Sequence, residues 1–194
     1  MLPAPDMVAD VFTQGQLESY ARRALNVIGS LPANSLPTDE IERLYHQLVV
    51  EPEYGADTLE ATWLVWHNAG RHEALDLLAS TLEELLPLLS IPARATALLL
   101  HAKMRRSSLS ASQILAQATL ADQLFERLAQ RRRQAQALEL MGDTHVTLGQ
   151  LQKSHEFHHR CLKLRQDLLC VDATVSQWQR DLSVSFERLW LRRT

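Results

Sequence analysis

Apolar side chains recur every three to four residues along almost the whole chain, and this spacing is what most limits the folds open to it. Glycine and proline are scarce, at 6 and 7 residues, and they separate the periodic segments. No alternating run of β-branched residues bounded by turn signals is present, so the sequence gives no indication of strands. These observations predict an all-α protein of nine helices, joined by short turns in an antiparallel array.

Capping and breaking residues divide this pattern into helices. The capping residues that we expect are Thr13, Thr38, Asp57, Ser110 and Thr174, and Ser90 with Pro92 is expected to restart the chain. Pro52 and Gly55 should end the second helix, and Pro87 should kink or fray the last turn of the fourth. The expected helices are 13–28, 38–48, 57–68, 72–89, 90–102, 110–128, 134–148, 150–171 and one that begins at 174.

The segment from Ala135 to Leu164 combines large, small and turn residues in a fixed order. A large apolar residue, a Met-Gly pair and a histidine on one helix precede a glycine turn and two small residues on the next helix. These residues are Leu138, Met141, Gly142, His145, Gly149, Ser154 and Cys161. We expect Gly142 to let Ser154 and Cys161 approach, because a large side chain at any of the three would hold the helix axes apart. In this order the segment resembles a tetratricopeptide repeat.

The resemblance is best over residues 134–190 and is to bacterial repeat arrays with long helices. Trp178 to Phe186 matches the start of a second repeat, and Trp63 to Leu75 matches with a one-residue gap. The resemblance implies antiparallel hairpins stacked as a short right-handed solenoid with a C-terminal capping helix. On this basis we expect an N-terminal helical segment at 1–56 that packs on a repeat domain at 57–194.

Stacked hairpins of this type expose a groove lined by the first helix of each pair. By the resemblance, the groove residues would be Asn68, His101, Asp143, Thr144 and Thr147. This implies a non-enzymatic adaptor or scaffold that holds a partner protein or peptide. A secretion-type chaperone is the alternative from the same class, because small bacterial repeat proteins of about this size have that role in some families. One dominant secreted client would favour the chaperone.

The end of the last predicted helix is apolar where a solvated cap would be polar. Trp190 takes the place of Gly142, a close-packing position, and Leu191 follows it. These two residues indicate either a covering partner or self-association as a homodimer.

Charge is distributed unevenly, although the net charge is only −3. Residues 1–90 hold 14 acidic and 4 basic side chains, whereas residues 91–194 hold 9 acidic and 16 basic ones. Two basic clusters near turns would share one edge of a stacked array: Arg105, Arg106, Arg131, Arg132 and Arg133. Such an edge attracts phosphates or an acidic peptide. The alternative is that these arginines lie in solvated turns near a helix C-terminus, where their positive charge interacts favourably with the helix dipole. Nucleic acid is disfavoured because no aromatic residues interleave with the basic run.

Three histidines fall close together on one predicted helix. His155 and His159 share a face one turn apart with His158 adjoining, a geometry that a transition metal can use, with Cys161 or His145 as a further ligand. No carboxylate stands in the His-Glu-x-x-His spacing that would activate a metal-bound water. We therefore prefer ordinary histidines of a repeat to a metal site, and keep a histidine-rich metal-binding protein as an alternative.

Motifs for catalysis, cofactors and membrane insertion are missing from the sequence. It has no Gly-x-Ser-x-Gly elbow, no phosphate-binding loop and no dinucleotide fingerprint, so we expect neither enzymatic activity nor a cofactor. No run of ~18 apolar residues predicts a membrane helix, and the first ten residues lack the features of a secretory signal. Cys161 and Cys170 lie about 13 Å apart along a helix, too far to pair. We expect a cytoplasmic protein.

Overall fold

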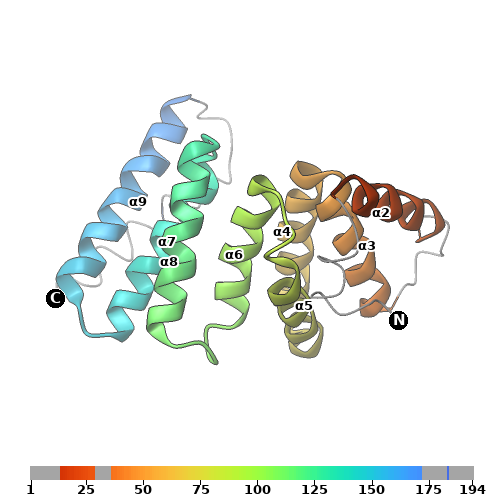
Figure 1. The fold of residues 1–194 in the computed structure, drawn as a ribbon. Helices are drawn as coiled ribbons and strands as arrows, with labels where there is room; N and C mark the ends of the chain where they lie inside the picture. Colours follow the sequence, from red (N-terminus) through yellow and green to blue (C-terminus); the bar gives the residue numbers. More distant parts are fainter. Residues whose placement is uncertain (1–13, 29–35, 172–182, 184–194) are drawn as a thin grey trace. The chain divides into compact units, whose positions relative to one another are not determined.

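The computed structural model describes residues 14–28, 36–171 and 183, and all regular structure in the two continuous ranges is α-helical. Eight helices lie in these ranges (Figure 1): α2 (Gln14–Ile28), α3 (Pro37–Val50), α4 (Pro52–Asn68), α5 (His72–Leu85), α6 (Ile91–Met104), α7 (Ala111–Arg127), α8 (Arg131–Thr147) and α9 (Leu151–Val171). The predicted all-α class is confirmed. The helix expected from Thr174 lies outside the described residues.

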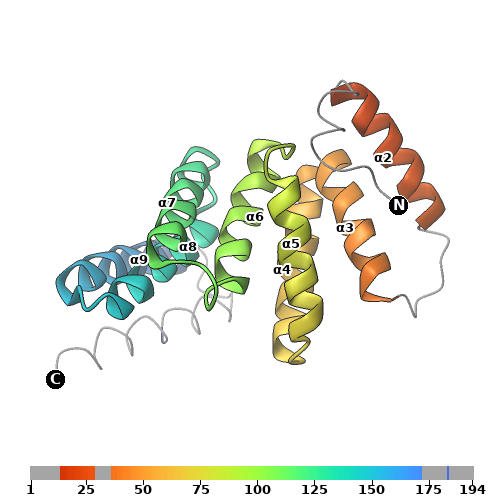
Figure 2. The same cartoon turned by 60° about the horizontal axis from the view of Figure 1, so that its bottom comes forward.

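The chain divides into two compact units. The first unit, Met1–Arg105, contains α2 to α6, and the second unit, Arg106–Thr194, contains α7 to α9. This division falls at a different place from the boundary that we expected after residue 56. Consecutive helices pack on each other: α2 on α3 and α3 on α4 in the first unit, and α7 on α8 and α8 on α9 in the second (Figures 1 and 2). In addition, α4 packs on α6.

Two helix starts agree with the predicted capping residues. At the start of α7 the Gln113 N–H donates to the Ser110 hydroxyl at 3.3 Å, and the Ser110 N–H donates to the Gln113 side chain at 3.0 Å. This reciprocal pair is a capping box. Ser90 is the N-cap of α6, and Pro92 lies in its first turn. Both predictions are confirmed, because these caps depend on residues close in sequence.

The start of α3 differs from the prediction. This helix begins at Pro37 with Leu36 as its N-cap, so the predicted cap at Thr38 is wrong. The Leu36 N–H donates to the Asp39 carboxylate at 3.0 Å. A proline suits the first turn of a helix, where its missing N–H leaves no hydrogen bond unmade. Asp39 and Pro37 together therefore move the start one residue ahead of Thr38.

Proline also explains two further corrections. Pro52 begins α4 rather than only ending the helix before it, so Asp57 lies inside α4 and is not its cap. Pro87 lies after α5, which ends at Leu85, and not in a kinked last turn. Without an N–H, a proline cannot continue the hydrogen-bond ladder of a helix interior.

Gly55, expected to end a helix, instead lies inside α4 where this helix crosses α3 at close range. A Cβ added to Gly55 would lie 2.7 Å from the Leu48 nitrogen and 2.8 Å from the Gln47 carbonyl carbon. The two helices thus touch backbone against backbone. Only glycine leaves room for this approach.

The core of the first unit is built from leucines of α3 to α6 around Trp66. Its buried members include Leu44, Leu48, Leu59, Trp66, Leu78, Leu82, Leu85 and Leu100. A smaller cluster of Leu17, Ala21 and Val49 attaches α2 to α3. In the second unit the buried apolar side chains include Phe125, Leu138, Leu140, Met141 and Cys161. Each unit therefore has a core of its own.

Candidate functional site

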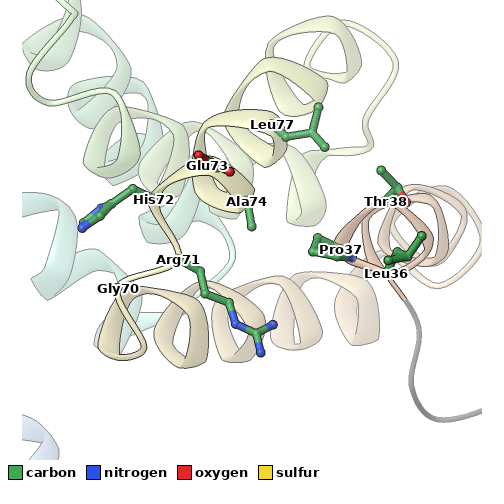
Figure 3. Close-up of a pocket in the computed structure, with 9 residues that line it drawn as sticks. All are labelled: Leu36, Pro37, Thr38, Gly70, Arg71, His72, Glu73, Ala74 and Leu77. Carbon is green, nitrogen blue, oxygen red and sulfur yellow. The ribbon is translucent and has the colours of Figure 1, made fainter.

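The larger of two neighbouring pockets in the first unit lies between the start of α3 and the turn that joins α4 to α5 (Figure 3). Its volume is about 830 Å³. The lining residues are Leu36, Pro37, Thr38, Gly70, Arg71, His72, Glu73, Ala74 and Leu77. Leu36 and Pro37 lie on one side and Ala74 and Leu77 on the other, and Arg71 extends from the turn alongside α4. We call this the larger pocket.

The turn beneath the larger pocket depends on local backbone geometry. Gly70 has a φ of 66°, in the region that favours glycine, and the Arg71 N–H donates to the Trp66 carbonyl at 2.9 Å. This reverses the chain directly after α4 and places Arg71 at the start of α5. The turn over residues 68–71 was predicted, and the structure has it.

A second pocket, which we call the smaller pocket, has a volume of about 400 Å³ and lies between α3 and α4. Its lining residues are Glu40, Arg43, Leu44, Gln47, Thr58, Ala61, Thr62, Val65, Trp66 and Arg71. Arg71 therefore borders both pockets. Together they offer apolar walls beside a guanidinium group, which suits a ligand with an apolar side chain and a nearby anionic group.

Exposed leucines border the larger pocket. Leu36 is 66% exposed and Leu77 is 44% exposed. Burying one leucine side chain fully is worth about 1.5–3 kcal/mol, so a partner that covered both would gain a substantial part of its binding free energy there.

The residues predicted to line a groove are divided between the two units. Asn68 and His101 belong to the first unit, and Asp143, Thr144 and Thr147 to the second. His101 and Thr144 are each only 2% exposed. Asn68 and Thr147 are exposed, but Thr147 donates its hydroxyl hydrogen to the Thr144 carbonyl.

Asp143 stabilises the second unit instead of facing a groove. Its Oδ1 lies 3.5 Å from Nε2 of His158, and its Oδ2 lies 3.6 Å from Nη1 of Arg106. His158 is buried, and its ring would lie 2.7 Å from a Cβ on Gly142. The close neighbour of Gly142 is thus an imidazole, which the sequence did not indicate. Ser154 and Cys161, on the same helix, are buried as well.

The five arginines of the predicted basic edge have separate environments. Arg105 belongs to the first unit, where it pairs with Asp76 at 3.2 Å and donates to the Ser80 hydroxyl at 2.6 Å. Arg131, Arg132 and Arg133 form the first turn of α8, which begins four residues after α7 ends at Arg127. Arg106 and Arg131 to Arg133 belong to the second unit.

The three neighbouring histidines do not converge. His155 and His159 are exposed with their ring centroids 6.4 Å apart, whereas His158 is buried against Gly142. His145 stacks on Phe157, with centroids 5.2 Å apart, and its Nδ1 lies 2.9 Å from the Gln150 side-chain oxygen. In the part of the chain that the structure describes, no three His, Cys, Asp or Glu residues are grouped to hold a metal ion.

Two predicted residues fall outside the described ranges, namely Trp190 and Leu191. Sequence reasoning missed the residues that line the two pockets, above all Arg43 in the smaller, Leu77 in the larger and Arg71 in both. The turn itself was visible in the sequence. The pairing of α3 with α4 and α5 was not, because it depends on how side chains of different helices pack on each other.

Comparison of the chain with models of protein families, with curated proteins and with solved structures finds no match. Among the described residues, no helix combines the length and the apolar character that crossing a bilayer requires.

Proposed function

We propose that this chain is a non-catalytic helical protein that binds a partner protein through its first unit. The observation that carries the proposal is the larger pocket, a space of about 830 Å³ bordered by the exposed side chains of Leu36 and Leu77. An apolar recess rimmed by polar residues is typical of surfaces that bind other proteins. An adaptor or scaffold role follows from this type of surface.

The finer interpretation of the fold, as a short right-handed solenoid of the tetratricopeptide type, is part of the proposal. Its support is the sequence pattern of residues 134–164 and the close contact of Gly142 with α9. A second support is that one hydrogen-bond pattern closes the α4–α5, α7–α8 and α8–α9 turns. In each, an N–H donates to the carbonyl five residues earlier: Arg71 to Trp66, Gln130 to Phe125 and Gln150 to His145.

Site-specific photo-crosslinking tests the proposed surface. A photoreactive amino acid at position 77, in the full chain expressed in its host cells, should give a defined adduct with another protein. The same amino acid at position 64 is the matched control, because Leu64 is 46% exposed on α4 and does not line the larger pocket. Leu36→Asp should weaken adduct formation at position 77 about tenfold or more, since it places a charge in the recess.

Equal yields at positions 77 and 64, or no adduct at position 77, would contradict the proposal. The identity of the cross-linked protein separates the two versions of the function. Several unrelated proteins indicate an adaptor, and one secreted client indicates a secretion-type chaperone.

A further inference from the structure

The smaller pocket is lined by one face of α3 and one face of α4. Glu40, Arg43 and Gln47 follow each other at helical spacing along α3, and Thr58, Thr62 and Val65 do so along α4. Trp66 is only 2% exposed and borders the same pocket near Arg71. The result is a groove between two helices that leads to the larger pocket at Arg71.

Two cations line this groove without an acidic partner. Among the described residues, the guanidinium group of neither Arg43 nor Arg71 forms a hydrogen bond or an ion pair. Glu40 is the one acidic residue that lines the smaller pocket, and it pairs with neither arginine within the described part of the chain. The planar donors of an arginine side chain match the two oxygens of a carboxylate.

The groove also contains buried polar atoms without partners. Nε of Arg43, a donor, and Oε1 of Gln47, an acceptor, are both enclosed and both lack a hydrogen bond. Leaving such groups unsatisfied costs free energy. Both atoms are enclosed, so a ligand supplies partners for them only if the side chains of Arg43 and Gln47 turn towards the groove. Because the two residues are one turn apart on α3, a ligand that matches them has a hydrogen-bond acceptor and a hydrogen-bond donor close together. A peptide segment has both, in its C=O and N–H groups, whereas inorganic phosphate at neutral pH is mainly an acceptor.

We propose that the smaller pocket binds an acidic segment of the partner protein, whose carboxylate pairs with Arg43 and Arg71 while a neighbouring apolar side chain enters the larger pocket. This rests on the proposed function and names the chemistry of the partner. Residues 1–105 hold 14 acidic and 7 basic side chains, so most of this unit repels an acidic segment. The two arginines therefore select where it docks.

Fluorescence anisotropy with short labelled peptides tests the proposal on the full chain. The probes are a glutamate–leucine peptide, a glutamine–leucine peptide and a lysine–leucine peptide of equal length. The glutamate peptide should bind at least about tenfold more tightly than the other two. Arg71→Gln and Arg43→Gln should each remove most of this preference. Arg94→Gln is the matched control, because Arg94 is exposed on α6 and lines neither pocket.

Glu40→Gln provides a test in the opposite direction. Removing the one carboxylate that competes for the arginines should increase the affinity for the glutamate peptide by about two- to fivefold. If Arg43→Gln fails to fold, Arg71→Gln still decides the question, because Arg71 is exposed at the start of α5. Circular dichroism confirms the fold of each variant.

Three outcomes would overturn the acidic-segment proposal. The first is equal affinity for the glutamate and glutamine peptides, and the second is unchanged affinity in both arginine variants. The third is that inorganic phosphate or single-stranded RNA displaces the labelled glutamate peptide at concentrations too low for the unlabelled glutamate peptide to displace it. The last outcome would indicate a phosphate ligand. A partner that still cross-links at position 77 would leave the proposed function intact, so the two failures are distinguishable.

Discussion

The hairpins α4–α5 and α8–α9 close with the same backbone hydrogen bonds but pack in different ways. In each, a glycine of positive φ follows the first helix, Gly70 at 66° and Gly149 at 70°. The next N–H then donates to the carbonyl five residues earlier, at 2.9 Å in both turns. Beyond the turn, α8 and α9 contact each other extensively, whereas α4 contacts α6 more than α5. A shared turn therefore does not decide how closely two helices pack.

The difference follows from residue size at equivalent distances from the turn. Seven residues before the turn glycine stands Gly142 in α8 but Trp63 in α4, and nine residues after it stands His158 in α9 but Ala79 in α5. Gly142 accepts the His158 ring against its backbone. Trp63 instead packs on the core of the first unit and lies under Lys103 of α6, whose Nζ is 4.9 Å from the ring centroid. A large residue at this position thus makes room for a third helix.

The largest effect is expected from filling the close contact in the second unit. Gly142→Leu should lower the free energy of unfolding by about 3 kcal/mol, because a side chain there collides with the His158 ring. Denaturant titration followed by circular dichroism measures this. His158→Ala in the same chain should recover part of the loss, since it removes the colliding ring. An unchanged midpoint for Gly142→Leu would show that α8 and α9 do not meet as closely as the structure indicates.

The close contact of the first unit lies between α3 and α4, and it can be filled in the same way. Gly55→Ala should lower the free energy of unfolding by about 2 kcal/mol, because the new Cβ meets the backbone of Gln47 and Leu48, which cannot rotate away. Gly15→Ala is the matched control on α2, where no atom lies within 4 Å of the added Cβ. This control should be neutral or slightly stabilising, because Gly15 lies in the first turn of α2 and the added Cβ meets nothing. Equal effects of the two substitutions would refute the α3–α4 contact.

A third turn of the same type, between α7 and α8, has alanine where the other two have glycine. Ala129 has a φ of 55°, which strains a residue with a Cβ by about 1–2 kcal/mol. Ala129→Gly should therefore stabilise the second unit by up to about 1 kcal/mol, and Gly149→Ala should destabilise it by a similar amount. Thermal unfolding of both variants checks this. The two variants should change the stability in opposite directions, and a loss of stability in Ala129→Gly would contradict the shared turn geometry.

The smallest effect is expected from pH, and its sign should differ between the units. Burial lowers the pKa of His46 in the first unit, although the Glu42 carboxylate 4.0 Å away opposes this. The unfolded chain then binds the proton more readily, so stability falls as pH drops through about 6.5. Burial raises the pKa of Asp122 in the second unit, against the effects of Gln134 and Arg160. Stability associated with Asp122 is therefore gained as pH falls through its raised pKa.

Hydrogen exchange at pH 7.5 and 5.5 separates these contributions by unit. Peptides from α3 should lose protection on acidification, and His46→Gln should abolish that loss. Asp122→Asn should change how the protection of peptides from α7 depends on pH, and it should leave the protection of peptides from α3 unchanged. The same pH response of α3 in wild type and His46→Gln would rule out His46 as its source.

Local signals in the sequence predicted much of the fold. Ser110 with Gln113, Ser90 with Pro92, and the turn at residues 68–71 were located correctly, because the groups that stabilise them are neighbours in sequence. Gly55 was misplaced, because the residue type does not show how closely α4 packs on the helix directly before it. Neither pocket was predicted, since their linings combine segments that only packing brings together.

What the sequence alone determined is the helical class, most helix boundaries and the turns, because apolar period, caps and glycine conformation act over a few residues. The tertiary structure decided which helices lie close and which side chains face solvent. It buried His101 and Thr144, packed the His158 ring against Gly142, and placed Arg43 and Arg71 around one recess. The physical reason is that side-chain size acts between helices, so its consequence depends on the residue opposite and not on the residue next in the chain.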